Sequence, residues 1–397
     1  MSIEALPRAC PICACSRKRV LFEQRFGELS EGSLLTRYDL VVCEDCGFAF
    51  ADGIPDQAVF DQHYANMSKY EYAHRGGAES ECDTARFTEI AAWIAGEIPS
   101  RECRILDVGC GTAGQLAKLR DHGYRHLTGL DPSPRCAELA KQHHRIEVLT
   151  GGLFKHDLPR NAFDLIILVG VLEHVSEVAR ALVGIRDCLS ADGLIFAEVP
   201  DATAFADWPD APYQELSIEH INFFSPASLE NLLRRAGFSL VKMNRPPRQF
   251  TATTVMPSAA GLFRRSTRPT PISPDQSSEP RLLEYIRQSA SEEERVADRI
   301  DDLMASGEPL IVWGVGTHTL HLMASTNLSK VNIVAFVDVN AKYEGKTLFG
   351  RPIVSPRGVT AYPEPILVCS RAFQDDIVRM IRGELNLSNR LITLYEI

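Results

Sequence analysis

The strongest constraint on the fold of this chain is an apolar segment that runs directly into a glycine-rich turn. Residues 104–114, RILDVGCGTAG, have the composition of a β-strand that ends in this turn, and the following residues, QLAKLRDHGY, are typical of a helix. A second apolar segment, HLTGLD, ends in Asp131, twenty residues after Gly111. Glycines allow the backbone to approach a ligand closely, and an acidic residue at the tip of the second strand accepts hydrogen bonds from both hydroxyls of a ribose. The pattern predicts a βαβ unit that binds a nucleoside.

Further β-rich segments follow this unit along the chain. They are residues 146–151, 163–171, 193–200, 239–244 and 251–256. Before the last two, SPASLENLLRRAGF predicts a helix with Ser225 as its N-cap and Gly237 as its terminator. The sequence therefore predicts an α/β fold with seven strands in its central sheet. The last two are too close in sequence for a helix between them, so we expect an antiparallel hairpin at one edge of an otherwise parallel sheet.

Residues 104–256 resemble the class I S-adenosylmethionine-dependent methyltransferases. The matching features are Asp107, Gly109, Gly111 and Gly114 in the first loop, Asp131 at the second strand tip, and the segments FDLIILVGVLEHV and LSADGLIFAEVP. The resemblance implies a Rossmann-like core in which the methionine part of S-adenosylmethionine lies along Gly109 and Gly111, the ribose on Asp131, and the adenine beside residues 152–154. The candidate cofactor-binding residues are Asp107, Gly109, Cys110, Gly111, Gly114, Asp131, Pro132, Leu153, Phe154 and Val169.

Four of the eleven cysteines form two C-x-x-C pairs near the N-terminus. The pairs are Cys10 with Cys13 and Cys43 with Cys46, and the segments VLFEQRF and RYDLVVC between them predict strands of a small ribbon. Four thiolates complete a tetrahedral Zn²⁺ site and leave no coordination position for a catalytic water, so we predict a structural zinc ion. A redox-active dithiol pair and a metal-free module are the alternatives, and the doubling of the motif argues against the first. Cys15 falls outside the pairs.

The C-terminal part of the chain repeats the pattern of the first βαβ unit. EPLIVWGVGTHTLHLM predicts a strand, a G-x-G turn and a helix, and VNIVAFVDVN predicts a second strand that ends at Asp338. Gly314 and Gly316 are not followed by the third glycine of the dinucleotide-binding pattern, because His318 and Thr319 come next. Three interpretations of this module remain open: NAD binding, anchoring of a nucleotide-linked sugar, and a purely scaffolding role.

The composition changes along the chain and divides it into modules. After residue 257 the sequence becomes rich in proline, serine and threonine, which predicts a linker. We expect a zinc-binding zinc-ribbon module over residues 1–65, a methyltransferase core over 66–256 with a helical lead-in at 66–100, a linker over 257–280, and a helix followed by a Rossmann-like α/β module over 281–397.

The order of these modules resembles the nucleotide-deoxysugar C-methyltransferases, which methylate nucleotide-linked 4-keto sugars next to the ketone. By this resemblance, Glu219 and His220 in YQELSIEHINFFS form a catalytic pair, and His174 is a further active-site histidine. One departure is Ile218, which stands where the family has a tyrosine.

Proton removal is the reason why a Glu-His pair suits methyl transfer to carbon. A base with a pKa near neutrality is required, which points to His220, or to Glu219 with a pKa raised by burial. Neighbouring side chains in an extended segment point to opposite sides, so we expect only one of the two to face the substrate. We favour His220 as the base, with Glu219 orienting it or binding substrate, and His174 as a donor to the developing enolate oxygen. The alternative is a strand-to-helix connector with a satisfied polar pair.

Aromatic residues near these positions admit two interpretations each. Phe223 and Phe224 either wall the pocket against water or pack in the core. Tyr64, Tyr70 and Tyr72 precede the core, and they either pack against its edge or line the mouth of a pocket. Tyr70 and Tyr72 are also the loose match to a tyrosine-rich stretch in the C-methyltransferases.

Charge and hydropathy limit the classes of partner. A net charge of −10 and a sequence pI near 5.6 give no electrostatic footprint for nucleic acid or an anionic membrane. No apolar run reaches the 18 residues of a transmembrane helix, and the N-terminus lacks a secretory signal pattern. We therefore expect a cytoplasmic monomer or homodimer whose partner is a small molecule, first of all a nucleotide-linked sugar.

C-methylation of a nucleotide-linked 4-keto deoxysugar is thus the favoured function. A methyltransferase of the same core that acts on oxygen or nitrogen of another small molecule or sugar is the alternative, and proton exchange at a substrate carbon separates the two. A zinc-ribbon protein that binds nucleic acid is a third hypothesis, against which the acidic pI argues. An oxidoreductase would require NAD to bind the second G-x-G turn.

Overall fold

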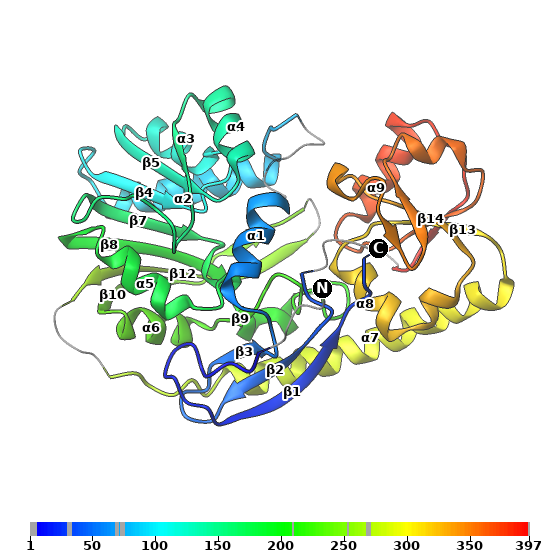
Figure 1. Cartoon of the computed structure of the whole chain (residues 1–397), viewed down its shortest axis with the longest axis horizontal. Helices are drawn as coiled ribbons and strands as arrows, with labels where there is room; N and C mark the ends of the chain where they lie inside the picture. Colours follow the sequence, from blue (N-terminus) through cyan, green and yellow to red (C-terminus); the bar gives the residue numbers. More distant parts are fainter. Residues whose placement is uncertain are drawn as a thin grey trace.

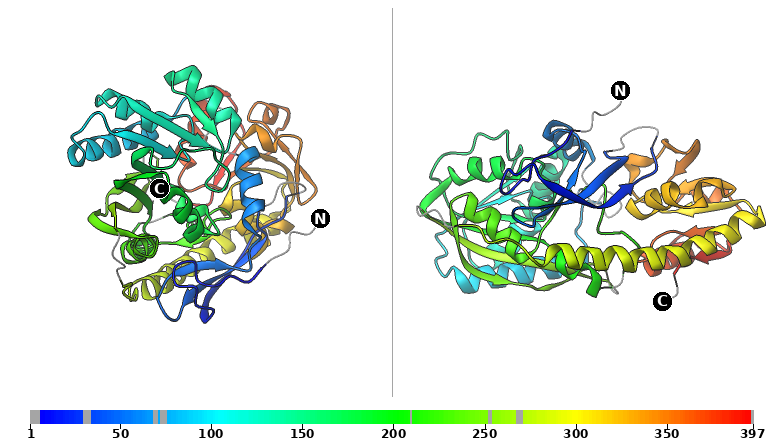
Figure 2. Two further views of the ribbon diagram at one scale, coloured as in Figure 1. Left: turned by 60° about the vertical axis from the view of Figure 1, so that its left-hand side comes forward. Right: turned by 90° about the horizontal axis from the view of Figure 1, so that it is seen from below.

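The structure is a computed structural model that describes residues 6–29, 34–67, 71, 76–208, 210–251, 254–266 and 271–395. Figure 1 shows a small N-terminal sheet, a central sheet covered by helices, and a C-terminal sheet. The long helix α7 (Ser278–Ser306) runs along one side of the molecule toward the C-terminal sheet, as Figure 2 shows from below. Tyr70 and Tyr72 lie outside the described residues.

The central sheet has the strand order β10-β12-β8-β7-β4-β5-β6, with the short β11 paired to β12. Its strands are β4 (Arg104–Val108), β5 (His126–Asp131), β6 (Val148–Thr150), β7 (Phe163–Val169), β8 (Leu189–Pro200), β10 (Phe238–Asn244), β11 (Pro247–Gln249) and β12 (Val255–Arg265). Strands β4 to β8 are parallel, and β12 runs antiparallel to both β8 and β10. This arrangement confirms the predicted Rossmann-like core with an antiparallel hairpin at one edge.

The second strand of the hairpin differs from its predicted position. The sequence predicts a strand over residues 251–256 and a linker from residue 257, whereas β12 continues to Arg265. The prediction of a linker is therefore wrong for this segment, PSAAGLFRR, because small residues lack the β-branched signature of a strand. Small residues fit here because both faces of the strand are covered: Ala259 packs in one hydrophobic core and Ala260 in the other.

Helices cover both faces of the central sheet. One face is covered by α2 (Glu81–Glu97), α3 (Gly114–Asp121) and α4 (Pro134–His144), and the other by α5 (Val178–Arg186) and α6 (Pro226–Arg235). Ile90 and Ile94 of α2, four residues apart on one face of the helix, are buried. Ser225 caps α6 as predicted, since its hydroxyl accepts a hydrogen bond from the Ser228 amide.

The cysteine-rich module forms a four-stranded antiparallel sheet, which confirms the predicted ribbon. Its strands are β1 (Lys18–Arg25), β2 (Arg37–Cys43), β3 (Ala49–Asp52) and β9 (Asn222–Phe223). The last of these belongs to the EHINFFS segment and pairs with β3, so this segment lies between the two modules. The Arg8 guanidinium crosses the same junction and donates to the carbonyls of Ile221 (3.1 Å) and Ser176 (2.7 Å). Helix α1 (Gln57–Met67) then leads to the central module.

The C-terminal sheet has the order β15-β16-β14-β13-β17-β18. Its elements are β13 (Leu310–Trp313), α8 (Thr317–Ser325), β14 (Ile333–Val337), β15 (Thr347–Leu348), β16 (Arg351–Val354), β17 (Ile366–Val368), α9 (Gln374–Arg379) and β18 (Leu391–Thr393). Apart from β15, these strands are parallel. The parallel strands of this sheet and of the central sheet are both arranged in the chain order 3-2-1-4-5, which confirms the predicted second Rossmann-like module.

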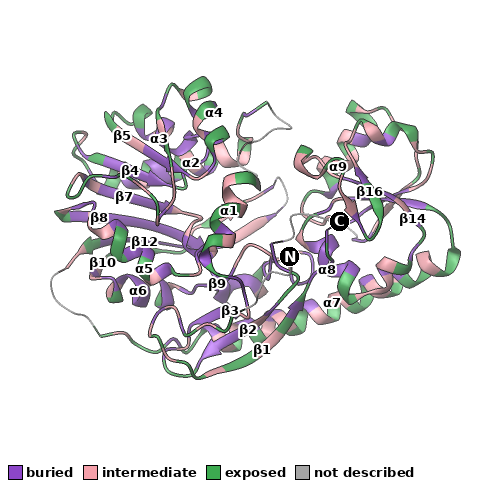
Figure 3. Ribbon diagram, viewed as in Figure 1, coloured by how far each residue is buried: buried purple, intermediate pink, exposed green. Residues whose placement is uncertain are grey.

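One hydrophobic core joins the N-terminal sheet to the C-terminal module. Phe26 and Leu29 belong to the same cluster as Leu320 and Leu348, and the Gly27 amide donates to the Leu320 carbonyl at 2.6 Å. Figure 3 shows that the strands of the large sheets are mostly buried, whereas α7 alternates between buried and exposed residues. None of the described helices combines the length and the apolarity needed to cross a bilayer.

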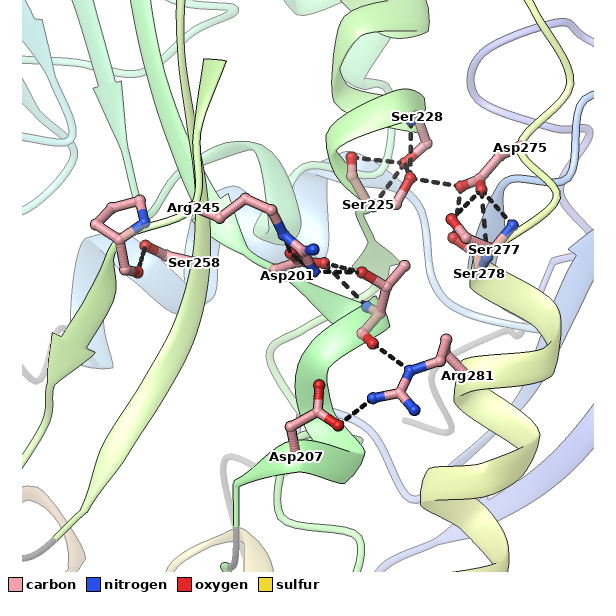
Figure 4. A network of polar contacts seen from close by, with 12 residues as sticks. Asp201, Asp207, Ser225, Ser228, Arg245, Ser258, Asp275, Ser277, Ser278 and Arg281 are labelled. Carbon is pink, nitrogen blue, oxygen red and sulfur yellow. Dashed lines mark hydrogen bonds and ion pairs between the residues drawn. The ribbon is translucent and has the colours of Figure 1, made fainter.

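A polar junction fixes the start of α7 against the central module (Figure 4). The Asp275 carboxylate accepts hydrogen bonds from the hydroxyls of Ser225, Ser277 and Ser278. The Asp275 amide donates to the carbonyl of Cys46 at 2.8 Å. The same residue therefore ties together the N-terminus of α6, the N-terminus of α7 and the cysteine-rich module.

Candidate active site

A cavity of about 740 Å³ opens at the carboxyl ends of the parallel strands in the central sheet. Parallel strands end at the same edge of a sheet, so the loops after β4, β5, β6 and β7 meet there. From the predicted site, the cavity wall includes Gly109, Asp131, Pro132, Leu153, Phe154, His174 and Glu219. Helix α1 contributes Asp61, Tyr64 and Ala65 to the same wall.

A smaller cavity of about 40 Å³ shares Gly109 and Gly170 with the large one. Four further predicted cofactor residues line this cavity, namely Asp107, Cys110, Gly111 and Val169. The one predicted cofactor residue that lines neither cavity is Gly114. A Cβ at Gly114 would lie 2.6 Å from Oε1 of Glu79 and 2.7 Å from the Phe87 ring, so this glycine allows close packing at the start of α3.

The glycine turn and Asp131 form one hydrogen-bonded unit. Gly109 has a φ of +70°, and a Cβ there would lie 2.8 Å from Val171, so the turn requires glycine. The Asp131 carboxylate accepts from the amide of Gly111 at 2.8 Å and from that of Ser133 at 2.9 Å. The Cys136 side chain also hydrogen-bonds to this carboxylate, and an ionised carboxylate has about four acceptor positions, so acceptor capacity is left for a ribose hydroxyl. Burial raises the pKa of Asp131, which lies at the cavity wall.

The small cavity contains groups of both charges. The Arg86 guanidinium donates to Oε1 of Glu198 from Nη2 (2.9 Å) and Nε (3.2 Å). Burial, together with the nearby Asp131, raises the pKa of Asp107 to about 8. Cationic and acidic side chains in one small cavity suit the carboxylate and ammonium groups of an amino acid. Arg86 was not predicted from the sequence; its signal is the spacing of four residues from Ile90 on the buried face of α2.

His174 sits at the centre of a polar cluster on the large cavity. The hydroxyl of Tyr64 and the carbonyl of Glu219 each lie 3.0 Å from Nδ1 of His174. A carbonyl can only accept a hydrogen bond, so Nδ1 of His174 carries a proton. Tyr64 thus lines the pocket, which was one of the two interpretations of this residue.

Glu219 and His220 occupy different positions, as expected for neighbours in an extended segment. Glu219 belongs to the wall of the large cavity, whereas His220 is not part of the wall formed by the described residues. The His220 ring lies 5.0 Å from the His174 ring. Both backbone amides of the pair donate to Oγ of Ser217, which fixes the turn. Nε2 of His63, a residue not predicted from the sequence, lies 4.0 Å from Oε1 of Glu219.

Phe223 and Phe224 pack in the core, which was one of their two interpretations. Phe223 is 2% exposed and lies against Tyr38, and Phe224 is 1% exposed and lies against Phe48. These two rings hold the segment that carries Glu219 and His220 against the cysteine-rich module.

The four paired cysteines converge as predicted. Their sulfurs all lie within 4.8 Å of one another, with Cys10 and Cys46 at 3.5 Å and Cys13 and Cys43 at 3.4 Å. Zn–S bonds of about 2.3 Å in a tetrahedron correspond to S···S separations of about 3.8 Å, so the cluster fits this ion. A hydrogen bond from the Cys46 thiol lowers the pKa of Cys10 to about 6, which favours a thiolate.

Comparisons with known proteins agree with this geometry. Residues 82–243 match a family model described as a methyltransferase domain, and residues 307–393 match a model described as C2185-like, N-terminal. The central module is thus a class I S-adenosylmethionine-dependent methyltransferase domain.

Two curated relatives indicate where this chain stands among such proteins. The tRNA U34 carboxymethyltransferase of Shewanella sediminis is 28% identical over 153 residues, which span 36% of this chain and 46% of that protein. The chain thus spans less than half the length of this relative. The C-methyltransferase NovU of Streptomyces niveus is 24% identical over 306 residues, which span 72% of this chain and 71% of that protein.

Among solved structures, this chain is similar to the 1,6-didemethyltoxoflavin-N1-methyltransferase of Burkholderia thailandensis, which holds 1,6-didemethyltoxoflavin and S-adenosylhomocysteine. The two are 20% identical with a TM-score of 0.42, and the match covers 57% of this chain and 97% of that chain.

Proposed function

We propose that this protein transfers a methyl group from S-adenosylmethionine to the carbon next to the ketone of a nucleotide-linked 4-keto deoxysugar. The observation that carries the proposal is the convergence of Tyr64, His174 and Glu219 on the cavity that also holds the glycine turn. A nucleophilic carbon needs both a base and a group that stabilises an enolate, and this cluster offers both kinds of group. The match to NovU over most of both chains supports the same chemistry.

The residues of the cofactor site would hold S-adenosylmethionine at both ends. Asp131 would accept from the ribose hydroxyls, Leu153 and Phe154 would flank the adenine, and Arg86 with Asp107 would bind the amino-acid end. When bound, the cofactor supplies a methyl group that its sulfonium charge has already activated. The protein therefore has to align the acceptor carbon and remove its proton.

The Glu219–His220 pair would remove this proton. Glu219 faces the cavity, so its carboxylate takes the proton from the acceptor carbon, and His220 lies beside His174 to receive or orient it. The electron pair of the broken C–H bond would be delocalised onto the ketone oxygen as an enolate, and the carbon of this enolate would accept the methyl group that the bound cofactor supplies. The Tyr64 hydroxyl stabilises the enolate oxygen, because the proton on Nδ1 of His174 already serves the Glu219 carbonyl. We therefore assign the base to Glu219, whereas the sequence favoured His220 as the group that faces the substrate.

We also propose a metal site and a cellular location for this protein. The four clustered thiols would hold a structural zinc ion, since their donor set and spacing fit it. We also propose a cytoplasmic location, since none of the eleven cysteines, all of them within the described residues, forms a disulfide in the structure.

The test is deuterium exchange into a nucleotide-linked 4-keto deoxysugar. The protein with S-adenosylhomocysteine should catalyse exchange of the proton next to the ketone in D₂O, and with S-adenosylmethionine it should place a methyl group on that carbon, as followed by NMR. Glu219→Gln should slow both reactions at least about a hundredfold, the contribution typical of a general base. Glu138→Gln, a change in an exposed carboxylate of α4 that lines neither cavity, is the control and should stay near wild type. Methylation of oxygen or nitrogen without exchange would replace C-methylation by the alternative function.

A further inference from the structure

A cluster of one glutamate and two histidines lies beside the large cavity. Glu173 and His174 end the short 3₁₀ helix that follows β7 (Leu172–His174), and His220 lies two residues before β9. Each of the three side chains has a possible ligand atom within 4.8 Å of those of the other two. The four paired cysteines are the other such group among the described residues. The cluster therefore has the donor atoms of a metal site that is separate from the cysteines.

Hydrogen bonds hold the two segments of this cluster together. The Ile221 amide donates to the carbonyl of Glu173 at 2.8 Å. The side-chain amide of Asn222, which is 2% exposed, donates to the carbonyls of Leu172 (2.8 Å) and Val175 (2.7 Å). The backbone on both sides of the cluster is thus fixed by the fold, and this is what a preorganised ligand site requires.

The Glu173 carboxylate contains an oxygen that lacks a partner. The residue is 2% exposed, and its Oε2 has no hydrogen-bond partner among the described residues. Its Oε1 lies 3.9 Å from Nε2 of His174, which is beyond hydrogen-bond distance. A buried carboxylate oxygen without a partner costs free energy. A cation between this carboxylate and the two imidazoles would offset that cost.

The His174 ring has the orientation of a metal ligand. Its Nδ1 donates to the Glu219 carbonyl, and metal-bound histidines almost always donate their other ring N–H to a carbonyl, a carboxylate or water. A metal ion binds histidine in its neutral form, in which the lone pair is then on Nε2, the nitrogen 3.9 Å from Glu173. Tetrahedral bonds of about 2.1 Å hold ligand atoms about 3.4 Å apart, so rotations of the side chains would close the site around an ion.

The donor set selects the kind of ion. Two imidazoles and one carboxylate suit divalent transition metals, whereas Mg²⁺ and Ca²⁺ prefer oxygen ligands. The cysteine cluster offers zinc a complete set of four thiolates, so it should take the first ion. His174 lies in the wall of the large cavity, so the cavity gives a second ion access to its site.

We infer that Glu173, His174 and His220 form a second metal site, which binds a divalent transition metal ion beside the cavity. An ion held there would occupy a ring nitrogen of each histidine, and a metal-bound nitrogen cannot accept a proton. The ion therefore inhibits methyl transfer, since His220 can no longer assist Glu219. This inhibitory role rests on the proposed function, whereas the binding of the ion does not.

Binding of Co²⁺ to the full-length protein tests the site. The protein is first loaded with one equivalent of Zn²⁺, and Co²⁺ is then added while its d–d absorption is followed. One further equivalent of Co²⁺ should bind without the charge-transfer band of a thiolate site, and an excess of Mg²⁺ should not displace it. Zinc-loaded protein that binds no Co²⁺, or that binds it with a thiolate spectrum, would overturn the inference.

Matched variants locate the ion. Glu173→Gln and His220→Gln should each weaken Co²⁺ binding at least about tenfold, because even the loss of an outer partner of a metal site costs that much. His126→Gln is the control and should leave Co²⁺ binding unchanged, since this exposed histidine also lies beside a carboxylate, 3.2 Å from Glu102. Unchanged Co²⁺ binding in folded Glu173→Gln and His220→Gln proteins would refute the site. His220→Gln decides the case if Glu173→Gln does not fold.

The inhibitory role has a measurement of its own. Zn²⁺ added beyond the first equivalent, at a concentration that fills only the wild-type site, should slow methyl transfer at least about tenfold in the wild type and less than about twofold in Glu173→Gln. Faster methyl transfer with the second ion would overturn the inhibitory role. Absence of methyl transfer to the sugar without added metal would refute the proposed function and not the metal site.

Discussion

Asp107 is the residue whose ionisation is most altered by the fold. It is 3% exposed at the end of β4, where burial and the neighbouring Asp131 raise its pKa to about 8, although Arg86 acts in the opposite direction. The carboxyl group is therefore mostly neutral in the folded protein near pH 7. In an unfolded chain the same group ionises near pH 3.9.

This difference predicts a pH dependence of stability. A pKa that is higher in the folded state gives a contribution that is fully present below pH 4 and is lost as the pH rises through about 8. Asp107→Asn removes the titration, so the fall in the free energy of unfolding between pH 5 and pH 8, at most about 4 kcal/mol from this group, should become smaller. Urea denaturation at both pH values without cofactor measures it. Parallel pH profiles of wild type and variant would contradict the assignment.

Arg86 offers a second prediction at this scale, because it pairs with Glu198 and also lines the small cavity where we propose that the cofactor binds. Arg86→Met leaves the buried Glu198 carboxylate without its partner, which should cost about 3–5 kcal/mol in the free energy of unfolding. The double variant Arg86→Met, Glu198→Gln removes the unpaired charge and should recover much of this stability. Both variants should bind S-adenosylhomocysteine at least about tenfold more weakly in calorimetry, since the guanidinium would be missing from the small cavity. Recovery of affinity along with stability would show that Arg86 has only a structural role.

These residues mark the limit of prediction from sequence at the site. Gly109, Gly111 and Asp131 could be predicted because one short strand–turn–helix segment and the next strand determine their geometry. Arg86 and His63 come from helices that precede the core, and only tertiary packing brings them to the site. The choice between Glu219 and His220 likewise depends on which side of the segment faces the cavity.

Among the elements, the N-terminus of α7 depends on one carboxylate. Burial opposes ionisation of Asp275, but hydrogen bonds from Ser225, Ser278 and Ser277 outweigh it and lower the pKa. A lowered pKa gives stability that is present above the unfolded pKa and is lost as the pH falls through the folded one. Asp275 should therefore stabilise the protein at neutral pH and lose this effect in acid.

Asp275→Asn should destabilise the protein by about 2–3 kcal/mol at pH 7, because hydrogen bonds to a charged acceptor become hydrogen bonds to a neutral one. The wild type should lose this advantage below pH 4. Asp207→Asn is the matched control: this carboxylate pairs with Arg281 near the same helix but its side chain is 56% exposed, so the change should cost less than about 1 kcal/mol. Figure 4 shows both carboxylates. Equal losses in thermal or urea unfolding would contradict the role of the junction.

Elements were predictable where their own composition carried the signal. Strands β4, β5 and β7 are rich in apolar and β-branched residues, and they appear where the sequence predicts them. The small residues of β12 gave no such signal, because its place in the sheet depends on the helices above and below it. Strand β9 has only two residues, and its pairing with a distant module creates it.

At the scale of the whole molecule, the cysteine-rich module connects the other two. Its sheet accepts β9 from the central module, directly after the Glu219–His220 pair, and its hydrophobic residues share a core with the C-terminal module. The position of the Glu219–His220 pair therefore depends on a module that contains no part of the loops around Gly109 and Asp131. Loss of the proposed zinc ion should affect catalysis more than cofactor binding.

Removal of zinc by a chelator should lower the melting temperature and reduce methyl transfer at least about tenfold, because a structural zinc site contributes folding free energy and the cysteine-rich module supports β9. The affinity for S-adenosylhomocysteine should change less than about threefold in protein that stays folded, since its site is built on β4 to β7. Cys46→Ser should reproduce the effect, whereas Cys15→Ser, outside the cluster, should retain both metal and activity. Metal content, calorimetry and methyl transfer measured on the same samples check these outcomes, and added zinc should restore the chelated protein. A metal-free protein with wild-type activity would show that the module folds around its hydrophobic core alone.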